Sequence, residues 1–287
     1  MPTTHVAHKI HELEAKANEI RISIINMLLE AKSGHVAGPL DMADIFTALY
    51  FNVLDIDPSD PLKEPRDKVV LSNGHICPVW YATLAHRGFI PLKELATLRK
   101  LGTRLQGHPH VGEPPGIENS GGPLGQGLSQ AVGMALAYKL DDIPNRIYCL
   151  GSDAELQEGQ IWEAAMFAGN KRLNNLVWII DRNNIQIDGY TENVMPIEPL
   201  RDKLESFNWH VIEIDGHNFD EIIAACNYAT TIFERPTVII AHTIAGKGID
   251  FMEYKFQWHS KTFKPGEAKL ALEELRTLGG KIRSEHQ

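Results

Sequence analysis

Two short apolar segments each end in small polar residues that could bind a metal ion and a diphosphate. Residues 147–150 run into Gly-Ser-Asp153-Ala, and residues 176–180 run into Asp-Arg-Asn183-Asn. Because one helix-length segment separates the two runs, they are predicted to form a strand, a crossover helix and a parallel strand. Ligands of open α/β sheets bind at the carboxyl ends of such strands. We therefore expect Asp153 and Asn183 to be neighbours at that edge.

The acidic residues around Asp153 narrow the choice of ligand. A helix beginning near Glu155 would offer free N–H groups and a positive dipole end to an anion, but Asp153, Glu155 and Glu158 would repel a bare phosphate. A divalent cation resolves this conflict. The Asp153 carboxylate, the Asn183 amide oxygen and a carbonyl near Ile185 are hard oxygen donors that suit Mg²⁺ or Ca²⁺. The alternative is structural: the acids only complement the helix dipole, and the asparagines form a turn.

Histidines follow glycine more often than chance predicts. With 13 histidines and 23 glycines, about one Gly-His dipeptide is expected, yet the chain has four, which end at His35, His75, His108 and His217. Three of them lie on loops that the strand pattern directs to one sheet edge, where imidazoles can donate to a diphosphate or to sugar hydroxyls and can move protons. His217, within Asp-Gly-His-Asn, is interpreted as part of a turn.

Composition excludes several classes of function. The chain has 287 residues, of which 43% are hydrophobic and 23% charged, as in ordinary soluble globular proteins. A formal charge of −9 argues against nucleic-acid binding and against an anionic membrane surface. The three cysteines are widely spaced without a C-x-x-C motif, so we expect them to be reduced and the protein to be cytoplasmic. No apolar run predicts a signal peptide or a membrane span.

Helical and strand patterns alternate along the chain. We predict strands over residues 68–72, 147–150, 176–180, 210–214 and 237–241, and helices over residues 8–32, 41–54, 76–87, 92–101, 126–140, 219–233 and 267–278. Asp41 is the predicted N-cap of the second helix. The pattern indicates a single doubly wound α/β domain with a mostly parallel sheet over residues 1–287.

A long glycine- and proline-rich segment, residues 102–127, interrupts this pattern. A loop of this length in a compact domain is usually functional or disordered, and its glycines allow a ligand to approach the backbone closely. Its G-x-x-G-x-G spacing differs from the nicotinamide fingerprint. We therefore expect it to border a binding site of another kind.

The central motif resembles the thiamine diphosphate signature, Gly-Asp-Gly followed some thirty residues later by Asn. Its extended form, over residues 155–165 and 184–189, is similar to transketolase. Further transketolase segments are matched in the same order by Ser33–His35, Leu71–His75, Gly107–Pro109, Gly122–Gly127 and Trp258-His259. The resemblance covers essentially the whole chain. It implies the thiamine diphosphate-binding fold and the N-terminal half of a transketolase.

The resemblance also implies roles for individual residues. Asp153, Asn183 and the Ile185 carbonyl would hold Mg²⁺ or Ca²⁺. His35, His108 and His259 would be the catalytic residues that face the sugar, and Glu158 and Glu163 would belong to a carboxylate cluster across a subunit interface. Contacts to thiamine diphosphate would come from His75, Gly122, Pro123, Leu124, Ala154, Glu158, Asn183 and His259. The cofactor would supply the carbon that adds to a ketone.

Some positions depart from the family pattern. Ser152 and Ala154 replace the signature glycines, Val-Ala-Gly-Pro follows His35, and Ser260 follows His259 where glycine is usual. These departures are consistent with an unusual sugar or with drift, and both interpretations stay open.

The chain is also less than half as long as a full transketolase, whose second half carries the glutamate that activates the aminopyrimidine and most substrate-phosphate ligands. We expect a split transketolase of the pentose phosphate pathway, acting on sugar phosphates and inactive without a separate C-terminal subunit, in an α₂β₂ assembly. Alternatives are the α chain of a 2-oxo-acid dehydrogenase, a deoxyxylulose-phosphate synthase-like enzyme or a non-enzymatic scaffold. The sugar-facing His35 and His108 argue against the dehydrogenase, and the intact Asp153 and Asn183 argue against the scaffold.

Overall fold

The computed structural model describes residues 4–277. The two ends of the predicted 1–287 domain, and the last residue of the predicted helix 267–278, lie outside the described residues.

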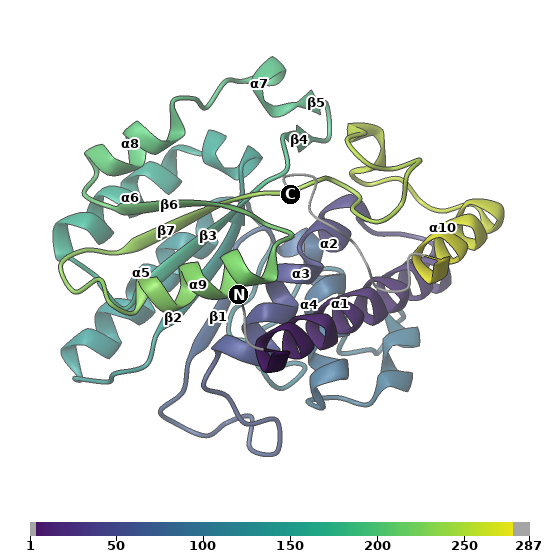
Figure 1. Ribbon diagram of the computed structural model, residues 1–287, viewed down its shortest axis with the longest axis horizontal. Coiled ribbons are helices and arrows are strands. Elements are labelled where there is room, and N and C mark those ends of the chain that lie inside the picture. Colours follow the sequence, from purple (N-terminus) through teal and green to yellow (C-terminus); the bar gives the residue numbers. More distant parts are fainter. Residues whose placement is uncertain (1–3, 278–287) are drawn as a thin grey trace.

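A five-stranded parallel sheet forms the centre of the molecule (Figure 1). Its spatial order is β1-β2-β3-β7-β6, with β1 Lys68–Leu71, β2 Ile147–Ser152, β3 Leu176–Arg182, β7 Thr237–His242 and β6 His210–Asp215. Every neighbouring pair is parallel. The inner strands are almost continuous runs of buried aliphatic residues, as expected where helices cover both faces. The predicted α/β sheet is confirmed.

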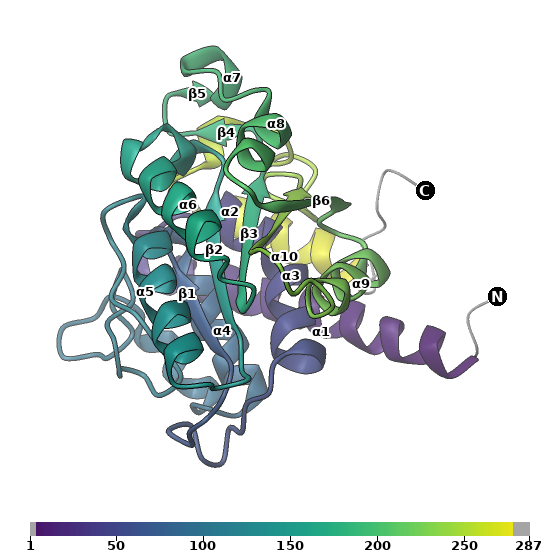
Figure 2. The ribbon, with the colours of Figure 1, turned by 90° about the vertical axis from the view of Figure 1, so that its left-hand side faces the viewer.

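Helices cover the two faces of the sheet and bury two separate hydrophobic cores (Figure 2). One face packs against α5 Gln126–Leu140, α6 Gly159–Lys171 and α8 Leu200–Ser206. The core on the other face is formed with α1 Thr4–Ala31, α3 Ala43–Ala48, α4 Cys77–Arg87, α9 Phe219–Ala229 and α10 Pro265–Thr277, of which α10 packs on α1. Among residues 4–277, no helix combines the length and apolarity that crossing a membrane requires.

Several shorter elements complete the fold, and some of them border the carboxyl edge of the sheet. They are α2 Ala37–Asp41, α7 Thr191–Val194, the antiparallel pair β4 Ile185–Gln186 and β5 Gly189–Tyr190, a π-helical turn Leu49–Val53, and 3₁₀ turns at Gly74–Ile76, Leu92–Thr97, Ala154–Gln157 and Phe256–Trp258. Together with the loops, they position the side chains of the site.

Four predicted helices differ from those observed, and the one expected over residues 219–233 ends at Ala229 in α9. The helix expected from Asp41 begins instead at Ala37, and Asp41 is the fully buried last residue of α2 rather than a cap. The helix expected to end at residue 101 is a 3₁₀ turn that stops at Thr97, because the chain reverses at Arg99, which has a left-handed φ of 60°. The helix expected near Glu155 starts as a 3₁₀ turn, where the Asp153 carboxylate accepts a hydrogen bond from the Ala154 N–H at 2.7 Å.

Candidate active site

A cavity of about 360 Å³ lies at the carboxyl edge of the sheet. The loops after β1, β2 and β3 contribute to it, and so do three segments far away in the sequence. The predicted site residues that line it are His35, His75, His108, Gly122, Leu124, Ala154, Glu158, Asn183, Ile185 and His259. Two predicted residues are not part of this lining: Pro123 lies between two lining residues, and Asp153 is fully buried.

Three imidazoles form a triangle in this cavity. The ring centre of His35 lies 4.6 Å from that of His75 and 5.2 Å from that of His259, and the rings of His75 and His259 are 5.3 Å apart. A backbone hydrogen bond of 3.3 Å from the Val36 N–H to the His259 carbonyl holds the C-terminal loop against the N-terminal one. The fold thus brings together three residues from segments that are far apart in the sequence.

The imidazoles are held neutral. Burial lowers the pKa of His35 and of His259 to about 4, with nearby His259, Arg99 and His108 adding to the effect on His35. Burial also lowers the pKa of His75 well below its ordinary value, and the other imidazoles contribute. At neutral pH each ring therefore offers one N–H donor and one nitrogen acceptor.

Two polar atoms of the cavity wall are buried without a hydrogen-bond partner in the part of the chain that the structure describes. They are Nδ1 of His35 and Oδ1 of Asn73, and both residues line the cavity. Buried polar atoms are nearly always satisfied in folded proteins, so unpaired ones at a cavity wall indicate a polar ligand.

The glycine-rich loop approaches the end of β1 closely. A Cβ on Gly74 would lie 3.1 Å from the backbone of Gly121 and Gly122, whereas the space that a Cβ on Gly122 would occupy is open. Asn119 fixes the loop, because its amide accepts from the Leu71 N–H at 3.0 Å and donates to the Leu71 carbonyl at 3.1 Å. The loop is therefore firmly held, and Gly122 leaves room for a ligand beside the backbone.

Glu155 supports the site from behind. Its buried carboxylate accepts hydrogen bonds from the Ser72 hydroxyl, from the Gly125 N–H at 2.6 Å and from the Ser152 N–H at 3.3 Å. Burial raises the pKa of Glu155 to about 7. This side chain joins the ends of β1 and β2 to the glycine-rich loop and is not itself part of the cavity lining.

The loops that carry the predicted metal ligands are in direct contact. The Asp153 carboxylate accepts from the Asn184 N–H at 2.8 Å and pairs with the Arg182 guanidinium at 2.9 Å. Burial raises the pKa of Asp153, and Arg182 opposes that rise. The Asn183 amide oxygen accepts from the Ile185 N–H at 3.1 Å.

Two further carboxyl groups hold the Asn183 side chain. Its amide nitrogen donates to Asp181 at 2.7 Å and to Asp41 at 3.1 Å. Burial raises the pKa of Asp181 to about 8, and burial together with the charge of Asp181 raises that of Asp41 well above its ordinary value. These contacts orient the amide oxygen of Asn183 away from the two acids. No group of three His, Cys, Asp or Glu that could hold a metal occurs in residues 4–277, so a metal here would need the amide and carbonyl oxygens.

Sequence reasoning missed several of these residues. The structure adds Arg182, Asp181 and Asp41, which act through partners distant in the chain. In the sequence, only the position of Asp181 at the end of a strand indicates that it could belong to the site. His217, by contrast, is not a residue of the site. Its backbone N–H donates to Asp215 at 2.9 Å, as the predicted turn requires. Its ring lies outside the cavity and forms a hydrogen bond with Asp44 at 2.8 Å.

A parallel α/β sheet with a polar cavity at its carboxyl edge, bordered by a glycine-rich loop, is typical of the class of α/β domains that bind phosphorylated cofactors. Residues 13–277 match the family model described as "Transketolase, thiamine diphosphate binding domain". The chain therefore belongs to the transketolase family, as the sequence resemblance predicts.

This chain is similar to transketolase subunits of about its own length and to one half of longer transketolases. The 6-deoxy-6-sulfo-D-fructose transketolase subunit SqwG of Clostridium sp. (strain MSTE9) is 45% identical over 93% of this chain and 98% of that protein. An apulose-4-phosphate transketolase subunit of Phocaeicola vulgatus is 38% identical over 97% of this chain and 99% of that protein. The crystal structure of transketolase from Campylobacter jejuni superposes with a TM-score of 0.87 at 33% identity, over 94% of this chain but 44% of that one. The chain thus corresponds to the N-terminal subunit type and spans less than half of the longer transketolases.

Proposed function

We propose that this chain is the N-terminal subunit of a thiamine diphosphate-dependent transketolase, which transfers a two-carbon ketol unit from a ketose to an aldose together with a separate C-terminal subunit. The observation that carries the proposal is the convergence of His35, His75 and His259 on one cavity with Asn183 and the open space beside Gly122. Relatives that the chain covers almost completely are named as subunits, which supports the partner.

The residues that line the cavity, together with the buried Asp153 behind its wall, fit the cofactor and its metal ion. The Asp153 carboxylate, the Asn183 amide oxygen and the Ile185 carbonyl form a set of hard oxygen donors on two touching loops, which would hold Mg²⁺ or Ca²⁺. The unpaired atoms of His35 and Asn73 and the open space beside Gly122 fit a polar ligand, and His75, Leu124, Ala154 and Glu158 line the same space. When bound, thiamine diphosphate supplies the nucleophilic carbon that attacks the ketone.

The histidines of this chain would bind and orient the sugar. His35, His108 and His259 are neutral, so each can donate a hydrogen bond to one sugar hydroxyl and accept one from another. A neutral imidazole can also accept the proton of a hydroxyl when the carbon–carbon bond beside it breaks, and return a proton when the new bond forms.

The substrate that we propose is an anionic ketose, with an unusual sugar preferred over the common pentose phosphates. The relatives named above carry the names of 6-deoxy-6-sulfo-D-fructose and apulose 4-phosphate. Ser152 and Ala154, where the family signature has glycines, lie at the cavity wall and support an altered substrate.

We further propose that residues 1–287 act as one thiamine diphosphate-binding unit in an α₂β₂ assembly in the cytoplasm. Glu163 lies on α6 next to Met166 and Phe167, whose side chains are 57% and 41% exposed, so this helix offers an apolar surface beside the carboxylate. The three cysteines are free and buried, as in a reducing compartment.

The test is to purify the chain alone and together with its C-terminal partner. With thiamine diphosphate and Mg²⁺, the pair should consume xylulose 5-phosphate or 6-deoxy-6-sulfo-D-fructose in the presence of an aldose phosphate, and the chain alone should not. Asn183→Ala should abolish transfer by the pair, whereas the exposed Asn227→Ala control should preserve it. Turnover by the isolated chain, or use of pyruvate instead of a ketose, would refute the proposal.

A further inference from the structure

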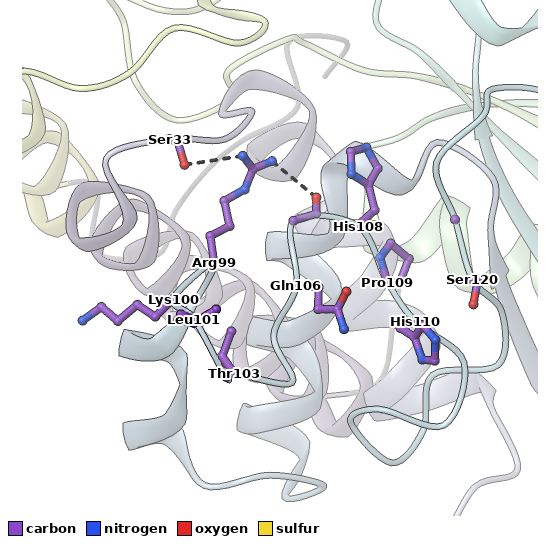
Figure 3. Close-up of a pocket in the computed structure, with 13 residues that line it drawn as sticks. Ser33, Arg99, Lys100, Leu101, Thr103, Gln106, His108, Pro109, His110 and Ser120 are labelled. Atoms are coloured by element: carbon purple, nitrogen blue, oxygen red, sulfur yellow. Dashed lines mark hydrogen bonds between the residues drawn. The ribbon is translucent and has the colours of Figure 1, made fainter.

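A second, wider cavity adjoins the first. Its volume is about 1050 Å³. Figure 3 shows its lining, which includes His108, and His108 also lines the first cavity. Its wall includes Ser33, Arg99, Lys100 and Gln106. A molecule that extends from the imidazole triangle past His108 would therefore reach this wall.

Arg99 lies between the two loops that carry the sugar-facing histidines. Its guanidinium donates to the Ser33 hydroxyl and to the Gly107 carbonyl, both at the long distance of 3.4 Å (Figure 3). A Cβ on Gly107 would lie 2.9 Å from the Arg99 Cζ, and one on Gly34 would lie 3.9 Å from its Nε. The guanidinium thus rests against the glycines that precede His35 and His108.

The charge of Arg99 is not compensated. Among the described residues, no ion pair involves Arg99, although Lys100 beside it pairs with Glu30 at 2.6 Å and Arg104 makes a bidentate pair with Glu94. Arg99 is exposed in this cavity, so its guanidinium is accessible to a dissolved anion. Because guanidinium has a planar fork of donors and binds phosphate and similar oxyanions well, an anion is its expected partner.

The backbone fixes this position. Arg99 has a φ of 60°, in the left-handed region that non-glycine residues avoid, and its N–H donates to the Leu105 carbonyl at 2.9 Å. The turn over residues 99–105 is therefore closed on itself and presents the side chain to the cavity.

We propose that Arg99 binds the anionic end of an open-chain sugar, a terminal tetrahedral oxyanion such as phosphate or sulfonate, while the carbonyl end of the same sugar reaches the His35, His75 and His259 triangle. This inference rests on the proposed function and assigns to this chain a substrate ligand of a kind that the family resemblance places on the partner. Arg99 is then a specificity-determining residue for charged over neutral sugars.

The experiment uses the complex of this chain with its C-terminal subunit, loaded with Mg²⁺ and an unreactive analogue of thiamine diphosphate, so that the sugars bind but are not cleaved. Calorimetry measures the binding of D-fructose 6-phosphate, 6-deoxy-6-sulfo-D-fructose and neutral D-fructose. Arg99→Met should weaken binding of an anionic sugar about tenfold or more and leave D-fructose unchanged, and Arg99→Lys should lose less. Arg104→Met, which removes a paired guanidinium from the same turn but outside the cavity lining, is the matched control and should change neither. Whichever anionic sugar is affected more identifies the terminal group.

The inference is wrong if the Arg99→Met complex binds both anionic sugars as tightly as the wild-type complex does. It is also wrong if the substitution weakens the binding of D-fructose by the same factor as that of the anionic sugars, or if the wild-type complex binds neither anionic sugar. These measurements read binding and not turnover. A complex that binds anionic sugars through Arg99 but transfers no ketol unit would therefore overturn only the proposed function.

Discussion

Arg182 is the residue that allows Asp153 to be buried as a carboxylate. The two side chains are 5% and 0% exposed, and Arg182 also pairs with Glu192 and Glu198 at the protein surface. Among the described residues, the guanidinium is the main positive charge that faces Asp153. A divalent cation bound by Asp153 would also compensate the negative charge of this buried carboxylate.

Arg182→Met should therefore destabilise the chain by about 3–5 kcal/mol, the usual cost of leaving a buried carboxylate unpaired. Mg²⁺ should restore part of the loss, because it replaces the missing charge. The measurement is the free energy of unfolding in urea with and without Mg²⁺. Arg104→Met, which breaks a partly exposed pair with Glu94, should lose about 1 kcal/mol or less and show no added Mg²⁺ dependence. An equal Mg²⁺ effect in both variants would contradict the assignment of Asp153.

The neutral histidines predict acid sensitivity. His35 and His259 have pKa values of about 4 in the folded chain against 6.5 ordinarily, so between these values the unfolded chain binds more protons than the folded one. The contribution of these two histidines to stability should therefore be fully present above about pH 6.5 and be lost as the pH falls towards 4. The raised pKa values of Glu155 and Asp181 act in the opposite direction over the same range, so the contribution is read as the difference between wild type and a histidine variant. Urea unfolding at a series of pH values measures this slope. His35→Gln should flatten it, and the exposed His11→Gln should not. Equal pH slopes for wild type and His35→Gln between pH 6.5 and 4 would contradict the neutral triangle.

At the scale of elements, the start of α5 is tied to the end of β1. The Gly127 N–H donates to the Ser72 hydroxyl at 3.0 Å, and that hydroxyl in turn donates to Glu155. A Cβ on Gly127 would lie 2.4 Å from the Ser72 Cα, which is backbone and cannot move aside. The position of the glycine-rich loop depends on this close approach.

Gly127→Ala should therefore cost about 1–3 kcal/mol, in the range of overpacked sites. Gly133→Ala in the same helix is the matched control, because nothing lies within 4 Å of its Cβ. It should stabilise by about 0.5–1 kcal/mol through helix propensity. Urea unfolding of the two variants gives the comparison. Equal effects of the two substitutions would mean that the contact between α5 and β1 is looser than described.

Long elements could be predicted from the sequence because their own side chains determine them. The inner strands are almost uninterrupted apolar runs. Helix α5 directly follows a glycine-rich loop that marks its start, and its bounds at Gln126 and Leu140 agree with the prediction. Short elements could not be predicted. The β4 and β5 pair and the helices α7 and α8 have little periodicity and depend on packing at the rim of the sheet.

The site was predictable where it follows the ends of strands. The loops of Asp153 and Asn183 touch as expected, since parallel neighbours in register must end together. Arg99 and Asp41 were not predictable as parts of the site. The sequence pattern assigns each to a helix or its cap, whereas their importance comes from residues 33, 107 and 183, which only the fold brings near.

At the scale of the whole molecule, a buried polar cluster joins three distant parts of the chain. Arg21 of α1 makes two hydrogen bonds to Asp44 of α3, at 2.9 and 2.7 Å, and a third to the Leu40 carbonyl at 2.9 Å. Asp44 also binds the ring of His217, which accepts from the Ile244 N–H at 2.9 Å. Burial acts to raise the pKa of Asp44, but Arg21 and His217 outweigh it and lower the pKa to about 2.

This cluster connects the N-terminal helix to the loops after β6 and β7, so its loss should weaken the whole fold and not one element. Arg21→Met leaves the Asp44 carboxylate buried without its cation and should cost about 3–5 kcal/mol. Arg201→Met is the control, because its pairs with Glu205 and Glu213 are exposed and worth about 1 kcal/mol or less. Urea unfolding followed by both tryptophan fluorescence and circular dichroism makes the measurement. The two probes should report one shifted transition, since a cluster that spans α1, α3 and the β6 loop couples them. If Arg21→Met unfolds in two steps, or destabilises as little as Arg201→Met, the cluster does not unite these parts.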